Sequence, residues 1–275
     1  MGSVGRAVLV LEDGYSLVGK GFGAPGTAFG EAVFSTGMTG YQETLTDPSY
    51  CGQIVVMTAP HIGNTGVNRE DSESLRMWPS GFVVRESSRV VSNWRATGTL
   101  ADELAINGIV GIEGVDTRAL TRHLREQGSM RMGIFSGSDS DNLEGLIKAV
   151  AQSPVMLGAS FTDQVSTAES YVVTAKGQKK ATCVAVDFGI KSMTPQRLSE
   201  RGIEVHVVNA NTKWEQIVAL KPNGIFLSNG PGDPASAVDA VGLVQKALKA
   251  KMPLFGICFG NQILGRALGL DTYKM

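Results

Sequence analysis

The chain has few cysteines, and they are scattered. Its 275 residues include three Cys, at positions 51, 183 and 258. An odd, widely spaced set of thiols fits a reducing cytoplasm better than a disulfide framework. The sequence has no CxxC pair and no cluster of His with Cys, so a metal site has little support.

Charge and hydropathy exclude further classes of partner. Lys plus Arg is 25 and Asp plus Glu is 26, so bulk charge attracts neither nucleic acid nor anionic lipid. No stretch approaches about 18 uninterrupted apolar residues, and the N-terminus lacks the apolar core and cleavage site of a signal peptide. The sequence therefore predicts no membrane partner. Its hydrophobic content of 43% is that of a globular protein, long enough for two domains.

The first part of the chain, residues 1–135, is predicted to be a compact α+β domain. Residues 7–23 read as two apolar segments around an Asp13-Gly14 turn signal, which is typical of a hairpin. Further along, the pattern predicts helices over 101–106 and 116–127, each followed by a short strand. In the second helix Asp116 is the expected N-cap, and Gly128 the residue after the last turn.

Three arginines share one face of the helix predicted over 116–127. Arg118, Arg122 and Arg125 are spaced by four and three residues, while Leu120 and Leu124 share another face. A solvated helix face is the ordinary explanation of such a charge run, and a contact with a partner protein is the other.

Residues 181–275 show a different pattern of predicted strands and helices from the first part of the chain. Residues 136–180 are rich in Gly, Ser, Asp and Thr and are predicted to be a linker region containing one helix, at 142–152. After them, apolar strands alternate with amphipathic helices, which predicts a parallel sheet covered on both faces. The expected strands are 182–189, 203–210, 224–230 and 252–258, and the expected helices are 194–202, 212–220, 236–250 and 259–269.

Cys258 lies at the last of these strand-to-helix junctions, in the pentapeptide Gly256-Ile257-Cys258-Phe259-Gly260. This is the cysteine counterpart of the G-x-S-x-G nucleophile elbow. Larger residues in place of the glycines would collide with each other or with the adjoining strand. A thiol at the start of a helix also meets the positive end of the helix dipole, which favours the reactive thiolate. A buried structural thiol is the alternative, and the strand–helix context favours the nucleophile.

A second turn, SNGPGDP at 228–234, follows another predicted strand. Its prolines fix the backbone and its glycines leave it bare, so a substrate carbonyl could approach main-chain N–H groups. An N–H of Gly230, Gly232 or a following residue could form an oxyanion hole together with the N–H of Phe259. Alone, this turn would be an ordinary loop; ligands of such sheets, however, bind beyond the carboxyl ends of the strands, where both turns fall.

These motifs resemble those of a known family. SNGPGDP and FGICFGNQ are similar to the class I glutamine amidotransferase domain, and VFSTGMTGYQETLTDPSY followed by APHIGNTGVN resembles the small subunit of carbamoyl-phosphate synthase. The likeness covers nearly all of the chain. It implies an α/β fold in which an N-terminal α+β domain (1–135) and a linker region (136–180) precede an amidotransferase-like parallel α/β domain (181–275), incomplete at its C-terminus.

The resemblance also implies an activity and its residues. Such subunits hydrolyse glutamine to glutamate and pass the ammonia to a large ATP-dependent synthetase subunit. The family pattern makes Cys258 the catalytic nucleophile, and it assigns glutamine binding to Ser49, Gly230, Gly232, Phe259 and Gln262. The chain has no GxxxxGK[ST] loop, so no cofactor is expected on it, and ATP and Mg²⁺ should belong to the large-subunit partner. Arginine biosynthesis, pyrimidine biosynthesis or both remain open as the pathway.

The sequence departs from the family pattern in two ways. Many relatives have Leu and His where this chain has Phe259 and Asn261, and Asn cannot act as a base. The family's catalytic His and Glu lie downstream of the cysteine, beyond Met275. We therefore expect a fragment of a protein roughly 100 residues longer, with little glutaminase activity of its own. None of His61, His123 and His206 is a good candidate for the missing base.

Two other functions stay open beside the glutaminase. A docking or regulatory module of the same fold would keep the sheet without the reaction, as the missing His and Glu suggest. Another cysteine hydrolase on the same sheet is disfavoured by the N-terminal motifs.

Overall fold

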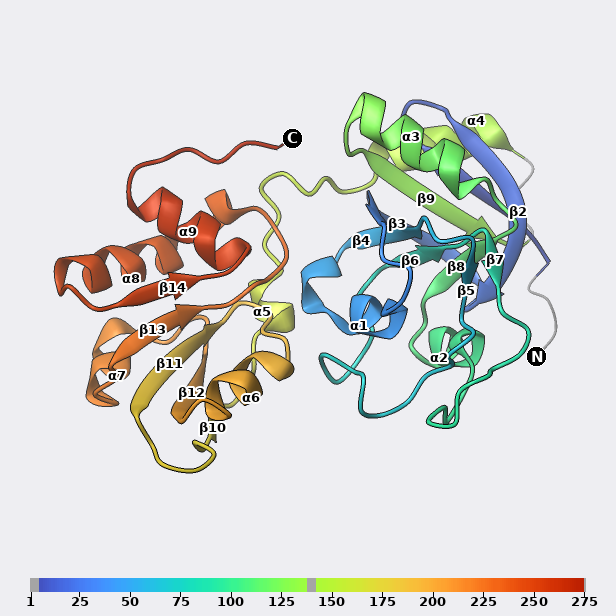
Figure 1. Ribbon diagram of the computed structural model, residues 1–275. Helices are drawn as coiled ribbons and strands as arrows, with labels where there is room; N and C mark the ends of the chain where they lie inside the picture. Colours follow the sequence, from blue (N-terminus) through green and yellow to red (C-terminus); the bar gives the residue numbers. More distant parts are fainter. Residues whose placement is uncertain (1–4, 138–141, 275) are drawn as a thin grey trace. The chain divides into compact units, whose positions relative to one another are not determined.

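The computed structural model describes residues 5–137 and 142–274, which fold into two units (Figure 1). One unit ends at Met156, and the other spans Leu157–Lys274. Each unit has its own buried clusters of hydrophobic side chains.

The first unit is built on a closed barrel. Its strands follow the order β1-β2-β8-β6-β4-β3-β9, mixing parallel and antiparallel neighbours. The bounds of these strands are β1 (Arg6–Leu11), β2 (Ser16–Gly23), β3 (Gly26–Ser35), β4 (Gln53–Met57), β6 (Gly81–Val83), β8 (Val110–Glu113) and β9 (Arg131–Ser136). The barrel closes where β1 pairs antiparallel with both β2 and β9, and it holds a cluster of buried hydrophobic side chains.

The hairpin predicted at the start of the chain is confirmed. β1 and β2 pair in antiparallel register, and Gly14 in the turn has φ 89°. The Asp13 carboxylate accepts a hydrogen bond from the backbone N–H of Tyr15 at 3.0 Å. A positive φ is the conformation that glycine adopts without steric cost, so the Asp-Gly pair fits this turn.

Helices and short segments pack around the barrel. They are α1 (Tyr41–Thr46), the 3₁₀ turn η1 (Pro48–Tyr50), α2 (Leu100–Ile106), α3 (Thr117–Gln127) and α4 (Leu143–Gln152), with a small pair of strands β5 (His61–Ile62) and β7 (Glu86–Ser87). The predicted ends of α3 are confirmed: the Asp116 carboxylate accepts from the Ala119 N–H at 3.0 Å, and Gly128 follows the helix with φ 89°. Leu120 and Leu124 anchor the inner face of α3 in the barrel core.

The second unit contains a five-stranded sheet. Its strand order is β10-β12-β11-β13-β14, with bounds β10 (Tyr171–Val173), β12 (Ile203–Asn209), β11 (Ala181–Asp187), β13 (Gly224–Leu227) and β14 (Leu254–Gly256). The pairs β11·β12, β11·β13 and β13·β14 are parallel, which confirms the predicted parallel sheet. β10 adds an antiparallel edge strand that the sequence pattern did not predict.

Helices cover both faces of this sheet, as expected. They are α5 (Thr162–Val165), α6 (Met193–Ser199), α7 (Trp214–Ala219), α8 (Val238–Lys249) and α9 (Phe259–Ala267), with the 3₁₀ turn η2 (Pro234–Ser236). Val184 and Val186 of β11 pack on one face with residues of α7, α8 and α9, whereas Ala185 packs on the other with α6. The period of two along a strand produces this alternation.

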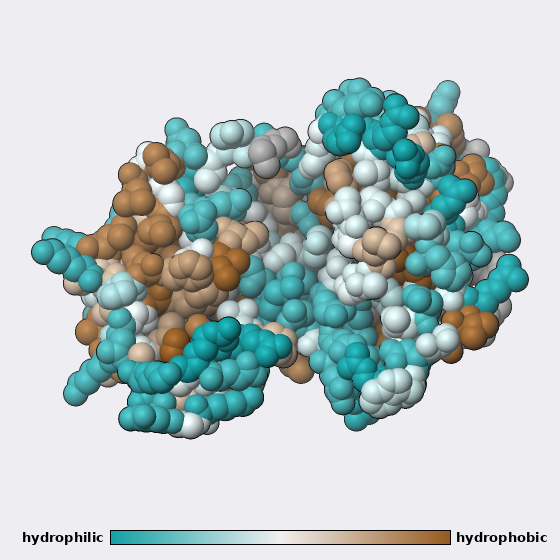
Figure 2. Space-filling view, viewed as in Figure 1, coloured by the Kyte–Doolittle hydropathy of each residue, from teal (hydrophilic) through white to brown (hydrophobic). Residues whose placement is uncertain are grey.

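Apolar side chains are exposed near β14, the last strand of the sheet order. Phe255 is 64% exposed and Ile257 is 44% exposed. Figure 2 shows hydrophobic residues gathered where Figure 1 places α8, α9 and β14; the exposed ones include Val238, Leu268 and Leu270. The edge strand β14 and the helices beside it therefore present an exposed apolar surface in the second unit.

The region predicted to be a linker contains regular structure. Residues 136–180 include α4, which packs on β1 and β9 of the first unit, and α5 and β10 of the second. Within the described parts of the chain, no helix combines the length and the apolar character needed to cross a membrane.

Candidate active site

Cys258 lies where β14 ends and α9 begins. Its backbone has φ 51° and ψ −115°, a conformation that residues with a Cβ rarely adopt, and the residue is exposed. The Ile257 N–H donates to the Leu227 carbonyl at 3.1 Å, and the Gly260 N–H donates to the Ile257 carbonyl at 3.0 Å. These bonds hold the thiol at the N-terminus of α9, open to solvent.

The two flanking glycines fill a space that no larger residue fits. A Cβ on Gly256 would lie 2.7 Å from the backbone carbon of Gly260. A Cβ on Gly260 would lie 2.2 Å from the Leu227 carbonyl oxygen of β13, the neighbouring strand. Both collisions expected from the pentapeptide are therefore present: one between the positions of the two glycines, and one with the adjoining strand.

The loop after β13 joins the cysteine turn directly. The Gly260 N–H donates to the Ser228 carbonyl at 3.0 Å, so the turns around Cys258 and around 228–232 are linked by a backbone hydrogen bond. Ser228 is fully buried and Asn229 is 7% exposed. The first two residues of the loop are therefore fixed in the protein interior. The glycines follow them at the carboxyl end of the sheet.

A buried turn after β11 supports the same loop. Asp187, 4% exposed, accepts backbone hydrogen bonds from Gly189 at 2.8 Å and Ile190 at 2.7 Å. The Phe188 N–H donates to the Ser228 hydroxyl at 2.8 Å, and the Asn229 side-chain amide donates to the Gly189 carbonyl at 2.8 Å. The turn formed by residues 187–190 thus holds the first two residues of the 228–232 loop.

Gly230 packs against this turn without space for a side chain. A Cβ at Gly230 would lie 2.0 Å from the Phe188 carbonyl oxygen. The Phe188 ring also packs edge-on against the Phe259 ring, with centroids 5.7 Å apart. The turn after β11 therefore contacts both candidate oxyanion positions, the backbone of Gly230 and the residue that follows Cys258.

Burial raises the pKa of the Asp187 carboxyl above its usual range, although backbone N–H groups of Ile190, Gly189 and Thr167 favour its ionised form. The Thr167 N–H donates to Asp187 at 2.8 Å from the segment that precedes β10. Asp187 thus joins the turn after β11 to the segment before β10.

A short segment at the start of the second unit pairs with the other end of the loop. Ser160 forms an antiparallel bridge with Gly232, and the Asp233 N–H donates to the Ala159 carbonyl at 2.9 Å. The Asp233 carboxylate accepts in turn from the Gly158 N–H at 2.9 Å. Gly232 has φ 97°, and a Cβ there would lie 2.8 Å from the Ala159 oxygen. Residues 158–160 therefore fix the conformation of Gly232.

The remaining predicted site residues fall into two groups. Phe259 is 2% exposed and its ring lies in the core, so its backbone is the part that can face a substrate. Gln262 is exposed one helical turn after Cys258, and its N–H donates to the Cys258 carbonyl at 3.0 Å. Ser49 belongs to the first unit, where it lies in η1 and its N–H donates to the Asp47 carboxylate at 2.9 Å. The structure thus brings Cys258, Phe259, Gln262 and the 228–232 loop together within one unit.

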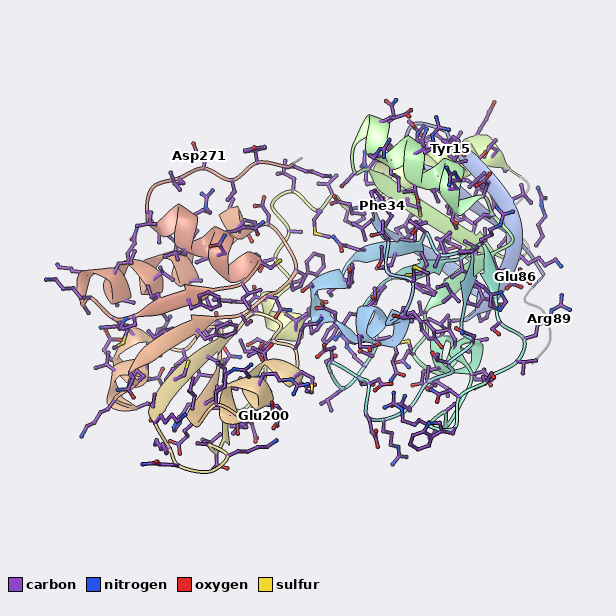
Figure 3. All side chains as sticks on the ribbon, viewed as in Figure 1. Tyr15, Phe34, Glu86, Arg89, Glu200 and Asp271 are labelled. Carbon is purple, nitrogen blue, oxygen red and sulfur yellow. The ribbon has the colours of Figure 1, made fainter. Side chains whose placement is uncertain are left out.

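Each of the three histidines is paired with an acidic side chain. His61 lies 3.9 Å from Glu86, which is labelled in Figure 3. His123 bonds to Asp13 at 2.6 Å and stacks on Tyr15, also labelled, with ring centroids 4.5 Å apart. His206 is the one histidine in the sequence after residue 156. It lies on β12, separated from β14 by β11 and β13, and it bonds to Glu204 at 3.1 Å.

Sequence reasoning missed the support given by residues 187–190 and 158–160. A signal for the first was present, since Asp187 directly follows the apolar run of a predicted strand, where ligand sites of such sheets form. The second had no signal, because residues 158–160 lie in a segment of linker-like composition. Among residues 5–137 and 142–274, no group of three His, Cys, Asp or Glu side chains is placed to hold a metal ion.

Both parts of the chain match family models of known proteins. Residues 9–134 match the family model of the carbamoyl-phosphate synthase small chain, CPSase domain, and residues 184–275 match that of class I glutamine amidotransferases. The chain is 61% identical over 269 residues to the carbamoyl phosphate synthase small chain of Streptomyces coelicolor, covering 98% of this chain and 71% of that protein. The chain belongs to the carbamoyl phosphate synthase small chain family.

A second relative gives the same result. The carbamoyl phosphate synthase small chain of Mycobacterium tuberculosis is 59% identical over 275 residues, covering 98% of this chain and 73% of that protein. As a member of this family, the chain combines a small-chain domain in its first unit with a glutamine amidotransferase domain in its second.

Proposed function

We propose that this chain is the glutaminase subunit of a carbamoyl-phosphate synthase and that Cys258 is its nucleophile. The observation that carries the proposal is the geometry of Cys258, which is exposed at the N-terminus of α9 with φ 51° and is hydrogen-bonded through Gly260 to the 228–232 loop. A side chain held outward on a strained turn between strand and helix is the arrangement of a nucleophile elbow.

In the proposed reaction, the Cys258 sulfur attacks the side-chain amide carbon of glutamine. A C–S bond forms, and the carbonyl becomes an oxyanion, which accepts hydrogen bonds from the N–H of Phe259 and from the backbone of Gly230 or Gly232. The first N–H groups of a helix have no partner within it, so the N–H of Phe259 can serve the substrate. The C–N bond then breaks, and the thiol proton leaves with the ammonia. Water hydrolyses the remaining glutamyl thioester to glutamate and regenerates the thiol.

Glutamine binding is proposed for residues near the nucleophile and for Ser49. Gln262 lies one helical turn from Cys258, and Gly230 and Gly232 present bare backbone, which supports their assignment to glutamine binding. Ser49 is proposed as a further glutamine contact, supplied by the first unit.

The proposed partner is a large synthetase subunit that uses ATP and Mg²⁺ and receives the ammonia. The two subunits would form a heterodimer, in which this chain carries no cofactor of its own. A cytoplasmic location is proposed with this function, because a catalytic thiol must remain reduced.

Covalent labelling tests the nucleophile. A diazoketone analogue of glutamine should label Cys258 in preference to Cys51 and Cys183, as read by mass spectrometry of the three peptides. Burial raises the pKa of the Cys51 thiol and raises that of Cys183 to about 11, so both stay protonated at neutral pH. Cys258→Ser is the control and should abolish the label. Equal labelling of all three thiols would remove the argument for Cys258.

One observation favours a second function, that of a catalytically inactive docking or regulatory module. His206 is distant from β14 in the sheet order and bonded to Glu204, so no histidine of the second unit lies beside the thiol. Glutamine hydrolysis by the 275-residue chain with a large subunit, compared with a form extended to the length of its relatives, decides between the two. Hydrolysis restored only by the extension supports the inactive module for this chain, and comparable rates support the glutaminase.

A further inference from the structure

A hollow in the first unit is lined by arginines. It has a volume of about 810 Å³ and lies between the outer face of α3 and the residues that follow β3 and β4. We define this basic hollow by the four arginines that line it, together with four threonines; its lining residues are Arg85, Arg118, Arg122, Arg125, Thr36, Thr58, Thr117, Thr121, Pro60 and Glu126.

The charge of the basic hollow is not balanced. Four arginines against one glutamate leave a net charge of +3, in a chain whose total is −1. Glu126 lies 3.9 Å from Arg122, and Asp116 outside the hollow lies 4.0 Å from Arg85. A neighbouring hollow that also contains Arg85 has three basic and three acidic side chains, and its charge is balanced. The basic hollow thus carries a net positive charge that the neighbouring hollow lacks.

The arginines of α3 are placed where like charges face one another on the helix surface. Arg118 and Arg122 are four residues apart, and Arg122 and Arg125 three apart, so like charges are neighbours on the helix surface. Arg118 also lies in the first turn, where the helix dipole disfavours a cation. All three side chains are exposed, and none is needed to anchor α3, because Leu120 and Leu124 do so from the other face. A negatively charged partner would relieve the repulsion.

The spacing of the arginines, and two exposed apolar residues close to Thr36 in the sequence, favour a protein partner over a small anion. Arg118 and Arg125 are seven residues apart, or about 10 Å along a helix, a distance that suits several carboxylates rather than one. Phe34 and Met38 lie on either side of Thr36 in sequence and are 37% and 85% exposed. Figure 3 labels Phe34 near the end of β3. Arginine, methionine and aromatic residues are enriched at protein interfaces.

We propose that the basic hollow docks an acidic protein surface of the large synthetase subunit, with Arg118, Arg122 and Arg125 pairing to its Asp and Glu side chains and Phe34 and Met38 providing apolar contact. The proposal rests on the proposed function for the identity of the partner. Arginine suits this role because its planar guanidinium can bind a carboxylate through two parallel hydrogen bonds.

The test uses the full chain with Arg118 and Arg122 both replaced by Ala. Binding to the large subunit should weaken about 10- to 100-fold, because exposed arginines at an interface are frequent hot spots. The affinity of the wild type should fall with added salt, and the variant should be less sensitive to salt. The thermal stability of the variant should equal or exceed that of the wild type, since repulsion within α3 is removed.

The matched control is Lys20→Ala with Arg89→Ala, which removes two cations from the neighbouring balanced hollow and should leave the affinity unchanged. Equal affinity of the α3 variant and the wild type overturns the proposal while leaving the proposed function intact. Failure of the wild type to bind any large subunit overturns both. If inorganic phosphate binds the wild type but not the α3 variant, and both bind the large subunit equally, the hollow is a small-anion site and the docking proposal is wrong.

Discussion

Replacing Gly260 by alanine tests the packing on which the cysteine turn depends. A Cβ at this position lies 2.2 Å from the Leu227 carbonyl oxygen and 2.6 Å from its carbon. Both are backbone atoms of β13, and Leu227 is fully buried, so no flexible side chain can move aside. Either β13 or the first turn of α9 must shift, and the Gly260 N–H hydrogen bonds to Ser228 and Ile257 shift with it.

The same helix contains a control. Gly265 also lies within α9, and a Cβ there meets no atom within 4 Å. Alanine at an open helical position stabilises by about 0.5–1 kcal/mol relative to glycine. Overpacking of a filled site costs about 1–3 kcal/mol. Replacement of glycine by alanine is therefore expected to change the free energy of unfolding with opposite signs at the two positions of α9, and the two changes should differ by about 1.5–4 kcal/mol.

Two internal cysteines allow each unit to be followed separately. Cys183 lies in β11 of the second unit, and Cys51 is 6% exposed in the first. Alkylation in increasing urea, read by mass spectrometry, reports the unfolding of each unit as its thiol becomes reactive. Gly260→Ala should lower the urea midpoint at Cys183 and leave that at Cys51 unchanged, and Gly265→Ala should raise the midpoint at Cys183.

Functional labelling completes the experiment. Gly260→Ala should slow the reaction of Cys258 with the diazoketone analogue even in the absence of urea, whereas Gly265→Ala should not. If Gly260→Ala matches Gly265→Ala in both midpoint and labelling rate, the close contact with β13 does not hold the cysteine turn, and the packing argument is wrong.

Three other substitutions test the rest of the site. Gly230→Ala places a Cβ 2.0 Å from the Phe188 carbonyl oxygen, so the rate at which the glutamine analogue labels Cys258 should fall while iodoacetamide still reacts. An unchanged labelling rate for the analogue contradicts the proposed role of Gly230. Burial raises the pKa of Asp187 in the folded state, so its ionisation opposes folding. Relative to Asp187→Asn, the wild-type urea midpoint at Cys183 should decrease as the pH rises from below the ordinary carboxyl pKa of 3.8 through the raised pKa. A difference that stays constant with pH contradicts this prediction. In a form extended to the length of its relatives, Ser49→Ala should raise the KM for glutamine about 2- to 13-fold, the equivalent of one hydrogen bond of about 0.5–1.5 kcal/mol, without affecting ammonia-dependent synthesis by the complex. An unchanged KM excludes Ser49 from the site.

Local pattern was sufficient to predict the second unit's main strands and helices. The apolar run at 182–189 became β11 (Ala181–Asp187), and the junction at Cys258 became the turn between β14 and α9. These elements alternate along the chain and pair in parallel with neighbours set by right-handed crossovers, so their arrangement follows from their order. Two turns at the carboxyl ends of parallel strands must then meet, as the Gly260–Ser228 bond shows.

Pairing between distant segments could not be predicted in the same way. β1 closes the barrel by pairing with β9, more than 100 residues later, as in the pair Leu9 and Ile134. Periodicity indicates that a strand has a buried face but does not name its neighbour. β10 was missed for a related reason: Tyr171 and Val172 are 41% and 51% exposed, so its three residues show no alternation of apolar and polar positions. The contacts of Asp187 were missed because Thr167, one of its donors, comes from the same linker-like stretch.

The bridge between Ser160 and Gly232 determines where the amidotransferase unit can be cut from its chain. The class I match begins at residue 184, whereas the unit itself begins at Leu157. A transplant that starts at the match would lack β10, the Thr167 donor to Asp187 and the backbone that pairs with Gly232. Exchange of this unit between proteins should therefore carry its 27 preceding residues, 157–183, as part of the module. Without them, the transplanted sheet would keep its cysteine turn but lose the segment that shapes the opposite loop.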